Sequence, residues 1–523
     1  MASKKKPGFA AKDHPPPDGK VRQSQAILAY GPGAMVDLVS DAVLVGGLDF
    51  WSAKASESFE EPRLRAWLLD RFPELRSTRT FLFPPEGDDR DPSRAAGIQV
   101  LEFPRWFVCQ NRDCRALARR GIGSPMRDER YVHDCKPKGS FFVPVRFVMA
   151  CENGHIQDFP WDRWVTHAPD CESKDLKLIE GPTGDFAELL VRCASCKRAR
   201  ALIDATVRST NPDCTGSRPW LGDSDEAGCS KKLRLLVRTA SNSYFAETAS
   251  ALTIPQARSA RDAVRAHMAN VAGVATEEEV AFAMKFSPQL KVAWKDFTPA
   301  QILQAIEDEK ANRREPTEAL RTAEFKQLVS SAVEKAGEYP AAEEPFFART
   351  LALQGDAMAG IARVTLVHKL REVRVQTGFT RFEATTPGLQ GEASKDASDL
   401  PVKAAPLAAR IRWLPGIVVR GEGLFVQLDE EAVRDWEDRT AVDRRIGALA
   451  RGHELWRGTR EHPPFYGGRF YLLHSLSHLL IQAVSLECGY SASAIRERIF
   501  CAPRHDATPM AAIEGLSQVA SDR

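Results

Sequence analysis

Residues 98–109 have the sequence IQVLEFPRWFVC, in which aromatic and aliphatic side chains alternate with other residues as far as Cys109. Residues 141–151, FFVPVRFVMAC, have a similar pattern and end at Cys151. Alternation of this kind, rich in aromatic and β-branched residues, is typical of β-strands. The two stretches therefore predict strands that each carry a cysteine to a point where a metal-binding turn can begin.

The composition around these stretches is that of a folded globular protein. Of the 523 residues, 43% are hydrophobic and 27% are charged, and a chain of this length exceeds what one hydrophobic core can organise. The amino terminus lacks the apolar core of a secretory signal, and no stretch has the roughly 18 consecutive apolar residues of a membrane-spanning helix. We therefore expect three or four units in a cytoplasmic protein that contacts no membrane.

The eleven cysteines are unevenly distributed. Nine lie between Cys109 and Cys229, and the other two are Cys488 and Cys501. Thiols stay reduced in the cytoplasm, so clustered cysteines there predict metal ligands rather than disulfides. Structural zinc takes four soft ligands in a tetrahedron and can hold a loop-rich region that has little core. Zinc is therefore the predicted cofactor, and scattered buried free thiols are the alternative interpretation.

The spacing predicts two four-cysteine zinc sites in this region. One begins with a Cys-x-x-Cys pair, which brings two thiolates to one ion from a single turn, and has the ligands Cys193, Cys196, Cys214 and Cys229. The other has the ligands Cys109, Cys114, Cys135 and Cys151. His133 and His155 are rival ligands because imidazole also suits zinc, and Cys171 is a spare cysteine that either site could use.

A pair of histidines near the end of the chain is a weaker metal candidate. His474 and His478 are four residues apart, so both lie on one face of a predicted apolar helix, and Cys488 could join them. No glutamate follows His474 to give the His-Glu-x-x-His pattern of metalloproteases. Buried hydrogen bonds are therefore the favoured interpretation of this pair.

The predicted fold class is α+β and multidomain, with zinc-ribbon-like four-cysteine modules in a β-rich N-terminal half and a mainly helical C-terminal region. The predicted units are a flexible basic arm (1–20), an N-terminal α+β domain (21–105), a zinc-binding β-rich region with two four-cysteine clusters (106–250), a helical domain or insertion (251–345), a β-rich segment (346–428) with a linker at 385–406, and a helical C-terminal domain (429–523).

Three local predictions accompany this division. Short helical pieces are expected on both sides of the Gly31-Pro32-Gly33 break. Residues 414–428, LPGIVVRGEGLFVQL, predict a hairpin whose turn lies near Gly421 and Gly423. Residues 491–500, SASAIRERIF, belong to the predicted C-terminal helices.

The sequence lacks common catalytic motifs. It has no Gly-x-x-x-x-Gly-Lys-Ser/Thr phosphate loop, no His-x-Lys pair of phospholipase D-type nucleases, no His-Glu-x-x-His and no Gly-x-Ser-x-Gly elbow. We therefore expect a protein without catalytic activity of its own. The enzymatic alternative is a metal-dependent nuclease built from the first cysteine cluster with His133, His155 and Asp158.

The charge balance limits how the chain can contact nucleic acid. Lys and Arg number 72 against 70 Asp and Glu, a formal net charge of +2, so any such contact must be local. Basic residues beside zinc knuckles commonly contact phosphates, and six of them follow Cys114 and Cys196: Arg115, Arg119, Arg120, Lys197, Arg198 and Arg200. A stand-alone zinc-ribbon module that binds DNA would explain them, as would a solvated face or an acidic protein partner.

Three segments together resemble the DrmB subunits of DISARM anti-phage defence systems. They are RQSQAILAYGPGAMVDL (22–38) followed by GLDFW, ACENGHIQDFPW (150–161) and LLHSLSHLLIQAVSLECGYSASAIRERIF (472–500). Because they span most of the chain in the expected order, the resemblance concerns the whole architecture rather than one motif.

The resemblance implies a non-catalytic accessory or scaffold subunit. Such subunits act with DrmA, a large helicase-like ATPase, in a complex that recognises phage DNA and helps restrict it, so a DrmA-like partner and DNA within the complex are expected. The chain departs from the family at its end, where a hydrophobic strand and a glycine-rich stretch are usual but this sequence has MAAIEGLSQVASDR (510–523). A truncated or diverged last domain is therefore expected.

Overall fold

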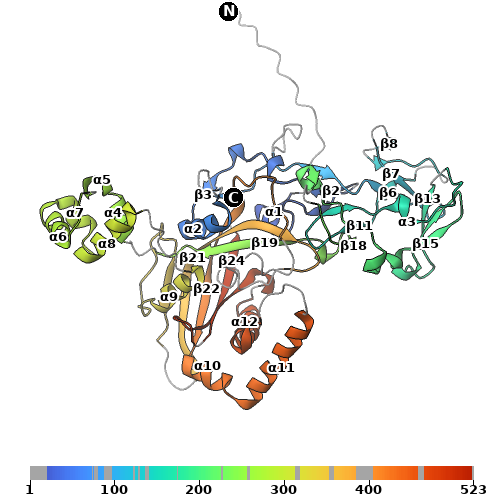
Figure 1. Ribbon diagram of the computed structural model, residues 1–523. Helices are drawn as coiled ribbons and strands as arrows, with labels where there is room; N and C mark the ends of the chain where they lie inside the picture. Colours follow the sequence, from blue (N-terminus) through green and yellow to red (C-terminus); the bar gives the residue numbers. More distant parts are fainter. Residues whose placement is uncertain are drawn as a thin grey trace, which may run out of the picture.

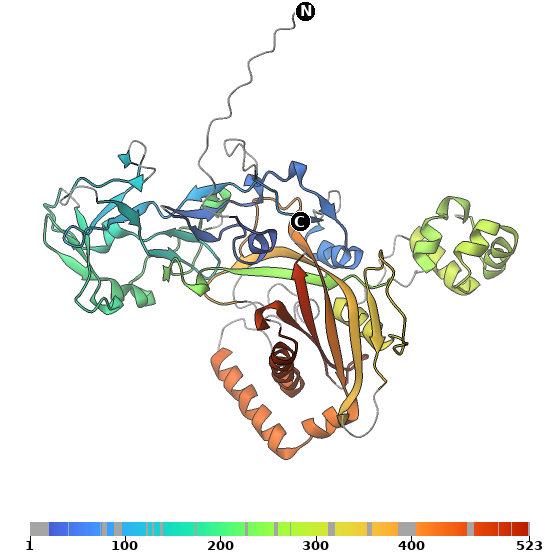
Figure 2. The same ribbon diagram turned by 180° about the vertical axis from the view of Figure 1, so that it is seen from behind.

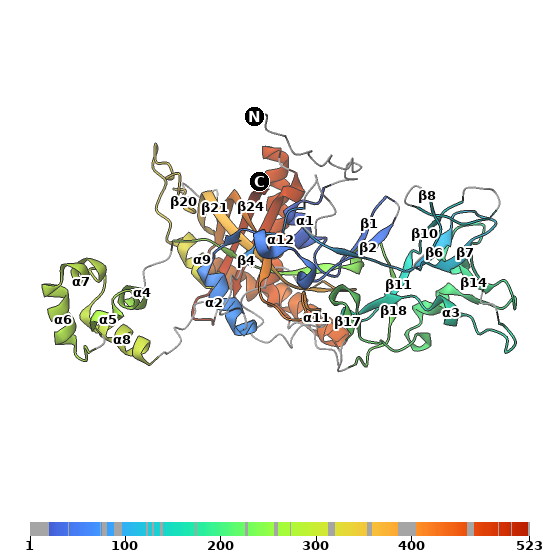
Figure 3. The same cartoon turned by 90° about the horizontal axis from the view of Figure 1, so that it is seen from above.

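The computed structural model describes residues 20–39, 41–73, 75, 81–87, 97–121, 124–127, 130–135, 140–172, 175–224, 228–255, 260–271, 273–311, 319–352, 358–384, 404–457, 465–489, 491–503 and 505–520. The predicted arm, apart from Lys20, and the greater part of the predicted linker at 385–406 lie outside these residues. Within the described part, even the longest helix lacks the apolar length that crossing a bilayer requires. A helical unit, a central sheet and a cysteine-rich β region lie in a row (Figure 3).

Two long antiparallel strands form the middle of the central sheet, as Figure 1 shows. The strand order is β19-β21-β22-β24-β23, and the bounds are β19 (Phe245–Leu252), β21 (Ile361–Thr380), β22 (Leu414–Leu428), β24 (Met510–Ala520) and β23 (Ile495–Ala502). Three short strands extend it, with β20 pairing with β21 and β4 lying between β22 and β3: β20 (Phe347–Thr350), β4 (Phe81–Leu82) and β3 (Ser58–Phe59).

The central sheet is covered on both faces, because successive side chains of a strand point to opposite sides. Phe425 of β22 packs with Phe325 on one face, whereas its neighbour Val426 packs with Leu473 on the other. The two covering helices are α9 (Leu320–Val329) and α12 (Gly467–Cys488). The chain reaches α12 through α10 (Glu430–Glu437) and α11 (Thr440–Arg457), which lie below the sheet in Figure 1.

A buried ion cluster connects β23, β21 and α9. Arg498 donates hydrogen bonds to both carboxylate oxygens of Glu324 at 2.9 Å and to Glu372 at 3.0 Å. Burial by itself would raise the pKa of Glu372, but Arg374 and Arg498 lower it to about 2. Buried charges are tolerated when each has a hydrogen-bonded partner. The cluster therefore fixes the position of the last strands against the middle of the sheet.

The C-terminal region differs from the mainly helical prediction because the chain ends in strands. Residues 495–502, which include all of IRERIF, form β23, and residues 510–520 form β24, which pairs with both β22 and β23. Figure 2 shows this red strand within the sheet. A short apolar run such as residues 510–520 is compatible with either a helix or a strand. Here it forms a strand because it pairs with β22.

Residues 414–428 form one continuous strand instead of the predicted hairpin. Gly423 faces β24 so closely that a Cβ atom there would lie 2.9 Å from Leu516 Cδ2 and 3.0 Å from the Gly515 oxygen. A glycine inside a strand commonly marks the close approach of another backbone. This glycine therefore allows β24 to pair, and the true hairpin partner of β22 is β21.

The N-terminal segment forms a small sheet beside the central one. Its order is β1-β2-β5, and the elements are α1 (Gln23–Leu28), β1 (Met35–Asp37), β2 (Ala42–Val45), β5 (Val100–Glu102) and, on the side of β3 and β4, α2 (Pro62–Arg71). The Gly31-Pro32-Gly33 break thus separates a helix from a strand, not two helical pieces, because Met35 pairs with Leu44 of β2.

Arg381, which directly follows β21, joins three distant parts of the chain. Its side chain has an exposed fraction of 0% and donates to the backbone oxygens of Gly33 at 2.7 Å, Gly154 at 3.0 Å and Ser243 at 2.7 Å. Burial lowers the pKa of the guanidinium to about 10. The N-terminal segment, the cysteine-rich region and the central sheet therefore meet at one side chain.

The cysteine-rich region consists of short antiparallel strands. The larger sheet has the order β10-β6-β7-β13-β14-β15, with bounds β10 (Phe142–Pro144), β6 (Trp106–Cys109), β7 (Ala116–Arg119), β13 (Leu176–Ile179), β14 (Leu190–Cys193) and β15 (Ala199–Ala201). The smaller sheet, β12-β11-β18, comprises β12 (Ile156–Asp158), β11 (Phe147–Ala150) and β18 (Arg234–Val237). Remaining elements are β8 (Met126–Arg127), β9 (Arg130–Tyr131), β16 (Ser217–Arg218), β17 (Asp223–Ser224) and α3 (Trp161–Trp164).

The two strands predicted at the cysteines are present, each divided into two pieces. Residues 98–109 contain β5 and then β6, which ends at Cys109, and residues 141–151 contain β10 and then β11, which ends one residue before Cys151. The strands therefore deliver both cysteines to turns, as the alternating pattern predicts.

The helical unit has a core of its own around the buried Trp294. Its helices are α4 (Ala260–Arg265), α5 (Met268–Val271), α6 (Glu277–Phe286), α7 (Pro288–Ala293) and α8 (Pro299–Lys310). Capping boxes begin two of them, with Thr276 accepting from the Glu279 amide and Thr298 from the Gln301 amide. The predicted helical domain at 251–345 is thus divided, because α9 packs on the central sheet instead.

Candidate metal centres

The cysteines and histidines of the β region form three groups of four, each with three cysteines and one histidine. In each group the ligand atoms all lie within 4.8 Å of one another. We call them site 1 (Cys109, Cys114, His133 and Cys135), site 2 (Cys151, His155, Cys214 and Cys229) and site 3 (His167, Cys171, Cys193 and Cys196).

The distances within the groups fit a tetrahedral zinc ion. Bonds of about 2.3 Å to sulfur and about 2.0–2.1 Å to nitrogen place two sulfur atoms about 3.8 Å apart, and sulfur about 3.6 Å from nitrogen. One Sγ to Sγ distance in each site is 3.6 Å (Cys109 to Cys135), 3.9 Å (Cys151 to Cys229) and 3.7 Å (Cys171 to Cys193). The Sγ to Nδ1 distances are 3.5–3.7 Å. Three cysteines and one histidine are a ligand set of structural zinc.

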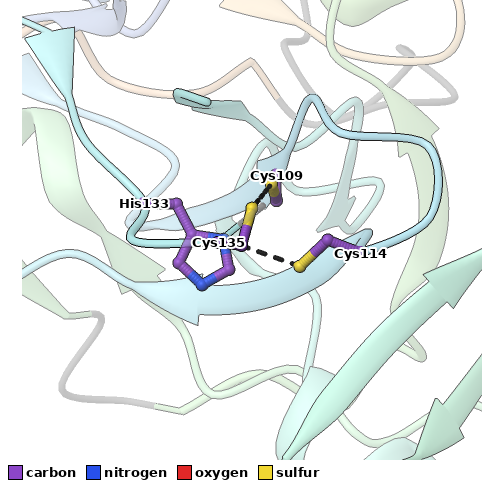
Figure 4. A group of neighbouring side chains, drawn as sticks. All are labelled: Cys109, Cys114, His133 and Cys135. Atoms are coloured by element: carbon purple, nitrogen blue, oxygen red, sulfur yellow. Dashed lines mark hydrogen bonds between the residues drawn. The ribbon is translucent and has the colours of Figure 1, made fainter. Parts of the chain in front are cut away.

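Site 1 lies between the strands of the larger sheet. Figure 4 shows its three sulfur atoms and its imidazole turned toward one another. Cys109 ends β6, Cys114 precedes β7, and the other two ligands follow β9. The His133 ring stacks on Phe142 with ring centroids 4.5 Å apart. Burial raises the pKa of the Cys109 thiol to about 12, so a thiolate at this position needs a cation beside it.

Site 2 joins the turn after β11 to a loop more than fifty residues later. Within the turn, the Cys151 amide donates to the His155 oxygen at 3.0 Å, and Gly154 has a left-handed φ of +81°. Cys229 Sγ accepts a hydrogen bond from the Asn153 side chain at 3.5 Å, and Cys214 Sγ accepts one from the Gly216 amide at 3.4 Å. Donors of this kind stabilise thiolates.

Site 3 is built from the turn between β14 and β15 and from the segment after α3. The backbone amides of Ala168 and Arg198, with smaller contributions from neighbouring side chains, lower the pKa of the Cys196 thiol to about 6. Cys193 is fully buried at the base of the turn. The local structure therefore favours a thiolate at Cys196.

The structure brings together all eight predicted cysteines, but it divides them differently from the predicted two sites. Cys151 belongs with Cys214 and Cys229, because β11 pairs with β18 and turns away from site 1. The rival histidines His133 and His155 and the spare Cys171 are all members of groups. The sequence analysis missed His167, although the His-x-x-x-Cys spacing to Cys171 is the reverse of the Cys-x-x-x-His spacing from Cys151 to His155.

The three groups lead to a prediction of metal content. Purified protein should contain three zinc ions per chain rather than two, because three groups with tetrahedral spacing are present. Elemental analysis against a measured protein concentration tests this number. His167→Ala should lower the content by about one ion per chain, whereas Cys488→Ser, at an exposed cysteine outside the groups, should leave it unchanged. A content of two ions in the unaltered chain would contradict the prediction.

A fourth group is formed by His474, His478 and Glu497. His474 Nδ1 lies 3.1 Å from a Glu497 oxygen, and the Ser477 hydroxyl donates to the same carboxylate. The favoured interpretation, buried hydrogen bonds for the pair, therefore fits only in part, because His474 is hydrogen-bonded but 41% exposed and His478 is exposed. Cys488, the predicted further ligand, is exposed and is not a member of the group.

The residues of the nuclease alternative do not come together. His133 and His155 belong to different four-ligand groups, and Asp158 accepts a hydrogen bond from the Arg105 amide at 3.0 Å. Burial raises the pKa of Asp158, although its hydrogen bonds oppose that shift. The described residues therefore offer no common centre for the three side chains.

The six basic residues predicted for phosphate contact separate into two sets. Arg120 forms ion pairs with two carboxylates, Arg198 donates to two backbone oxygens, and Arg200 forms an ion pair and lies over a tryptophan ring. Arg115, which is ion-paired with Glu180, and Lys197 line a groove between sites 1 and 3, and Arg119 is exposed.

Comparison with known proteins identifies relatives of both the β region and the chain as a whole. Residues 22–245, which contain all three sites, match the family described as Domain of unknown function (DUF8724). The chain is also similar to the DISARM protein DrmB of Bacillus paralicheniformis, with 26% identity over 490 residues that cover 89% of this chain and 81% of that protein. The resemblance predicted from three sequence segments is confirmed, because the chain is similar to a DISARM protein DrmB along most of its length.

Proposed function

We propose that this chain is a subunit of a DISARM anti-phage complex and serves there as a non-catalytic scaffold for a DrmA-like helicase ATPase. The observation that carries the proposal is the similarity to the DISARM protein DrmB along nearly the whole chain. The similar residues include both the central sheet and the cysteine-rich region. We therefore assign the scaffold role to these two parts together and not to one of them.

The three metal groups support a structural role for zinc in this scaffold. Each offers four ligands, and four protein ligands leave no open position for a substrate or an activated water. Bound zinc would cross-link loops that have few apolar residues. In each site the metal would join two chain segments, which rigidifies the surface that a partner meets.

Helices α11 and α12 offer apolar surface for that partner. Leu455 and Leu486 are 85% and 84% exposed, and Trp456 and Leu479 are more than half exposed. The two helices pack against each other. Several large apolar side chains in water are costly for a soluble monomer and commonly mark a protein contact.

Co-purification tests the proposal. Affinity-tagged protein expressed with its helicase-like neighbour should retain that ATPase and change its DNA-stimulated rate. Leu455→Asp with Leu486→Asp should reduce the retained ATPase at least tenfold, because charge is introduced into an apolar contact. The matched control is Val292→Asp, which lies at an exposed apolar residue of the helical unit. If the unaltered chain neither retains the ATPase nor alters its rate, the scaffold proposal is wrong.

A further inference from the structure

A groove of about 770 Å³ lies between sites 1 and 3, and its lining is predominantly basic. The five cationic side chains are Arg112, Arg115, Lys177, Arg192 and Lys197. Two carboxylates, Asp113 and Glu180, also line it. The resulting net charge of +3 exceeds the +2 of the entire chain. Positive charge is therefore concentrated in this groove.

Strand β13 forms the floor of the groove, with one metal-binding turn on each side. The Leu178 amide donates to the Arg115 oxygen at 2.9 Å, which ties the turn of site 1 to the strand. The Ala194 amide donates to the Asp175 oxygen at 2.6 Å, which ties the turn of site 3 to the same strand. The basic residues that follow Cys114 and Cys196 therefore line one groove from opposite sides.

Those two basic residues have strained backbones. Arg115 has a φ of +45° and Lys197 has a φ of +64°, in the left-handed region where glycine is the favoured residue. Each occupies the position directly after a metal-ligand cysteine, in two turns that are far apart in the sequence. Strained backbone of this kind is concentrated at functional sites. A long cationic side chain is thus present twice where a glycine would fold more easily.

A second unfavourable feature lies on the floor of the groove. Lys177 and Arg192 are directly opposite each other in the register of β13 and β14. Like charges at such paired positions destabilise a sheet. Within the described part of the chain, Arg112, Lys177 and Arg192 form no ion pair, whereas Arg115 is paired with Glu180. These unpaired positive charges do not help the chain to fold. An anionic ligand in the groove would neutralise them.

We propose that this groove binds the sugar-phosphate backbone of a nucleic acid strand. The lining contains no aromatic side chain on which a base could stack, so the contacts are to phosphates and carry no sequence preference. The inference deepens the proposed function, on which it rests, by assigning the DNA contact of the complex to this groove.

Binding of labelled oligonucleotides by the isolated chain, followed by fluorescence anisotropy at several salt concentrations, tests the groove. Lys177→Gln with Arg192→Gln removes two cations and touches no metal ligand. It should weaken binding at least tenfold at low salt. It should also lower the slope of log affinity against log salt by about 1.4 for a single strand, or about 1.8 for a duplex.

Two controls separate binding from folding. Lys291→Gln with Lys295→Gln removes the same charge from exposed positions of the helical unit and should leave both affinity and slope unchanged. Lys197→Gly should weaken binding but raise the midpoint of thermal unfolding, because it relieves the left-handed strain. If the only role of Lys197 were to support site 3, the Lys197→Gly protein would instead lose zinc and become less stable.

Unchanged affinity in the double variant, or weaker binding accompanied by zinc loss, would overturn the groove assignment. Competition by poly-glutamate as strong as that by DNA would also overturn it, in favour of an acidic protein segment. Because the assay needs no ATPase, failure here leaves the co-purification result standing, and failure of co-purification leaves the groove standing.

Discussion

Cys151→Ser is expected to unfold the part of the cysteine-rich region around site 2 and to lower the zinc content by one ion per chain. Cys151 is fully buried in the core of that region, together with Cys193 and Cys214. Binding of structural zinc contributes about 10–16 kcal/mol in zinc-finger peptides, which is comparable to the whole stability of a typical domain. Loss of one thiolate at site 2 should therefore remove most of the free energy that holds Cys214 and Cys229 beside the turn after β11.

Elemental analysis and limited proteolysis measure this effect together. The variant should lose one zinc ion and become sensitive to protease between β11 and β18, while the helical unit, which has its own core, should remain resistant. Cys488→Ser provides the matched control, since that thiol is exposed and lies outside the described groups. A Cys151→Ser protein that keeps its zinc and its protease resistance would show that site 2 binds no structural metal.

Arg381→Met should lower the free energy of unfolding by about 3 kcal/mol or more, because it leaves two buried carbonyl oxygens and one part-buried one without their donors, and each buried group costs about 1–3 kcal/mol. These oxygens belong to Gly33, Gly154 and Ser243, so three parts of the fold lose their common contact. Urea unfolding followed by tryptophan fluorescence measures the change, and Trp220, close to Arg381, should report it.

The control for this prediction is Arg434→Met. Arg434 forms an ion pair with Glu430 on the surface of α10 and is 45% exposed, so its loss should cost less than about 1 kcal/mol. Arg381→Lys should restore only part of the stability, because one ammonium group lacks the fork of donors that reaches three carbonyls. Equal effects of Arg381→Met and Arg434→Met would contradict the role assigned to the buried guanidinium.

The segments that carry the family resemblance have a common physical explanation. Gly33 lies in the first segment and Gly154 in the second, and both accept hydrogen bonds from Arg381 at the end of β21. Arg498 lies in the third segment and pairs with Glu372 of β21. Three stretches that are far apart in sequence are therefore bound to one strand, and this explains why they identify the architecture together.

The sequence alone predicted the local features of the candidate site. Strand alternation located the end of β6 at Cys109 and the end of β11 one residue before Cys151, because side-chain direction along a strand depends only on near neighbours. The short spacing between Cys193 and Cys196 likewise predicted a metal-binding turn. The family resemblance, which rests on local segments, was also available at this level.

The tertiary structure decided which local pairs share a metal. Each site joins two pairs that are separated by between nineteen and about sixty residues, as in the union of Cys151 and His155 with Cys214 and Cys229. Spacing does not determine such a union, because it follows from the pairing of β11 with β18 and of β13 with both β7 and β14. Pairing with β22 and β23 likewise made residues 510–520 a strand, and the pairing of β13 with β7 and β14 brought two distant basic residues to one groove. Local chemistry is a property of neighbours in the chain, whereas a metal centre or a groove depends on which neighbours the sheet places together.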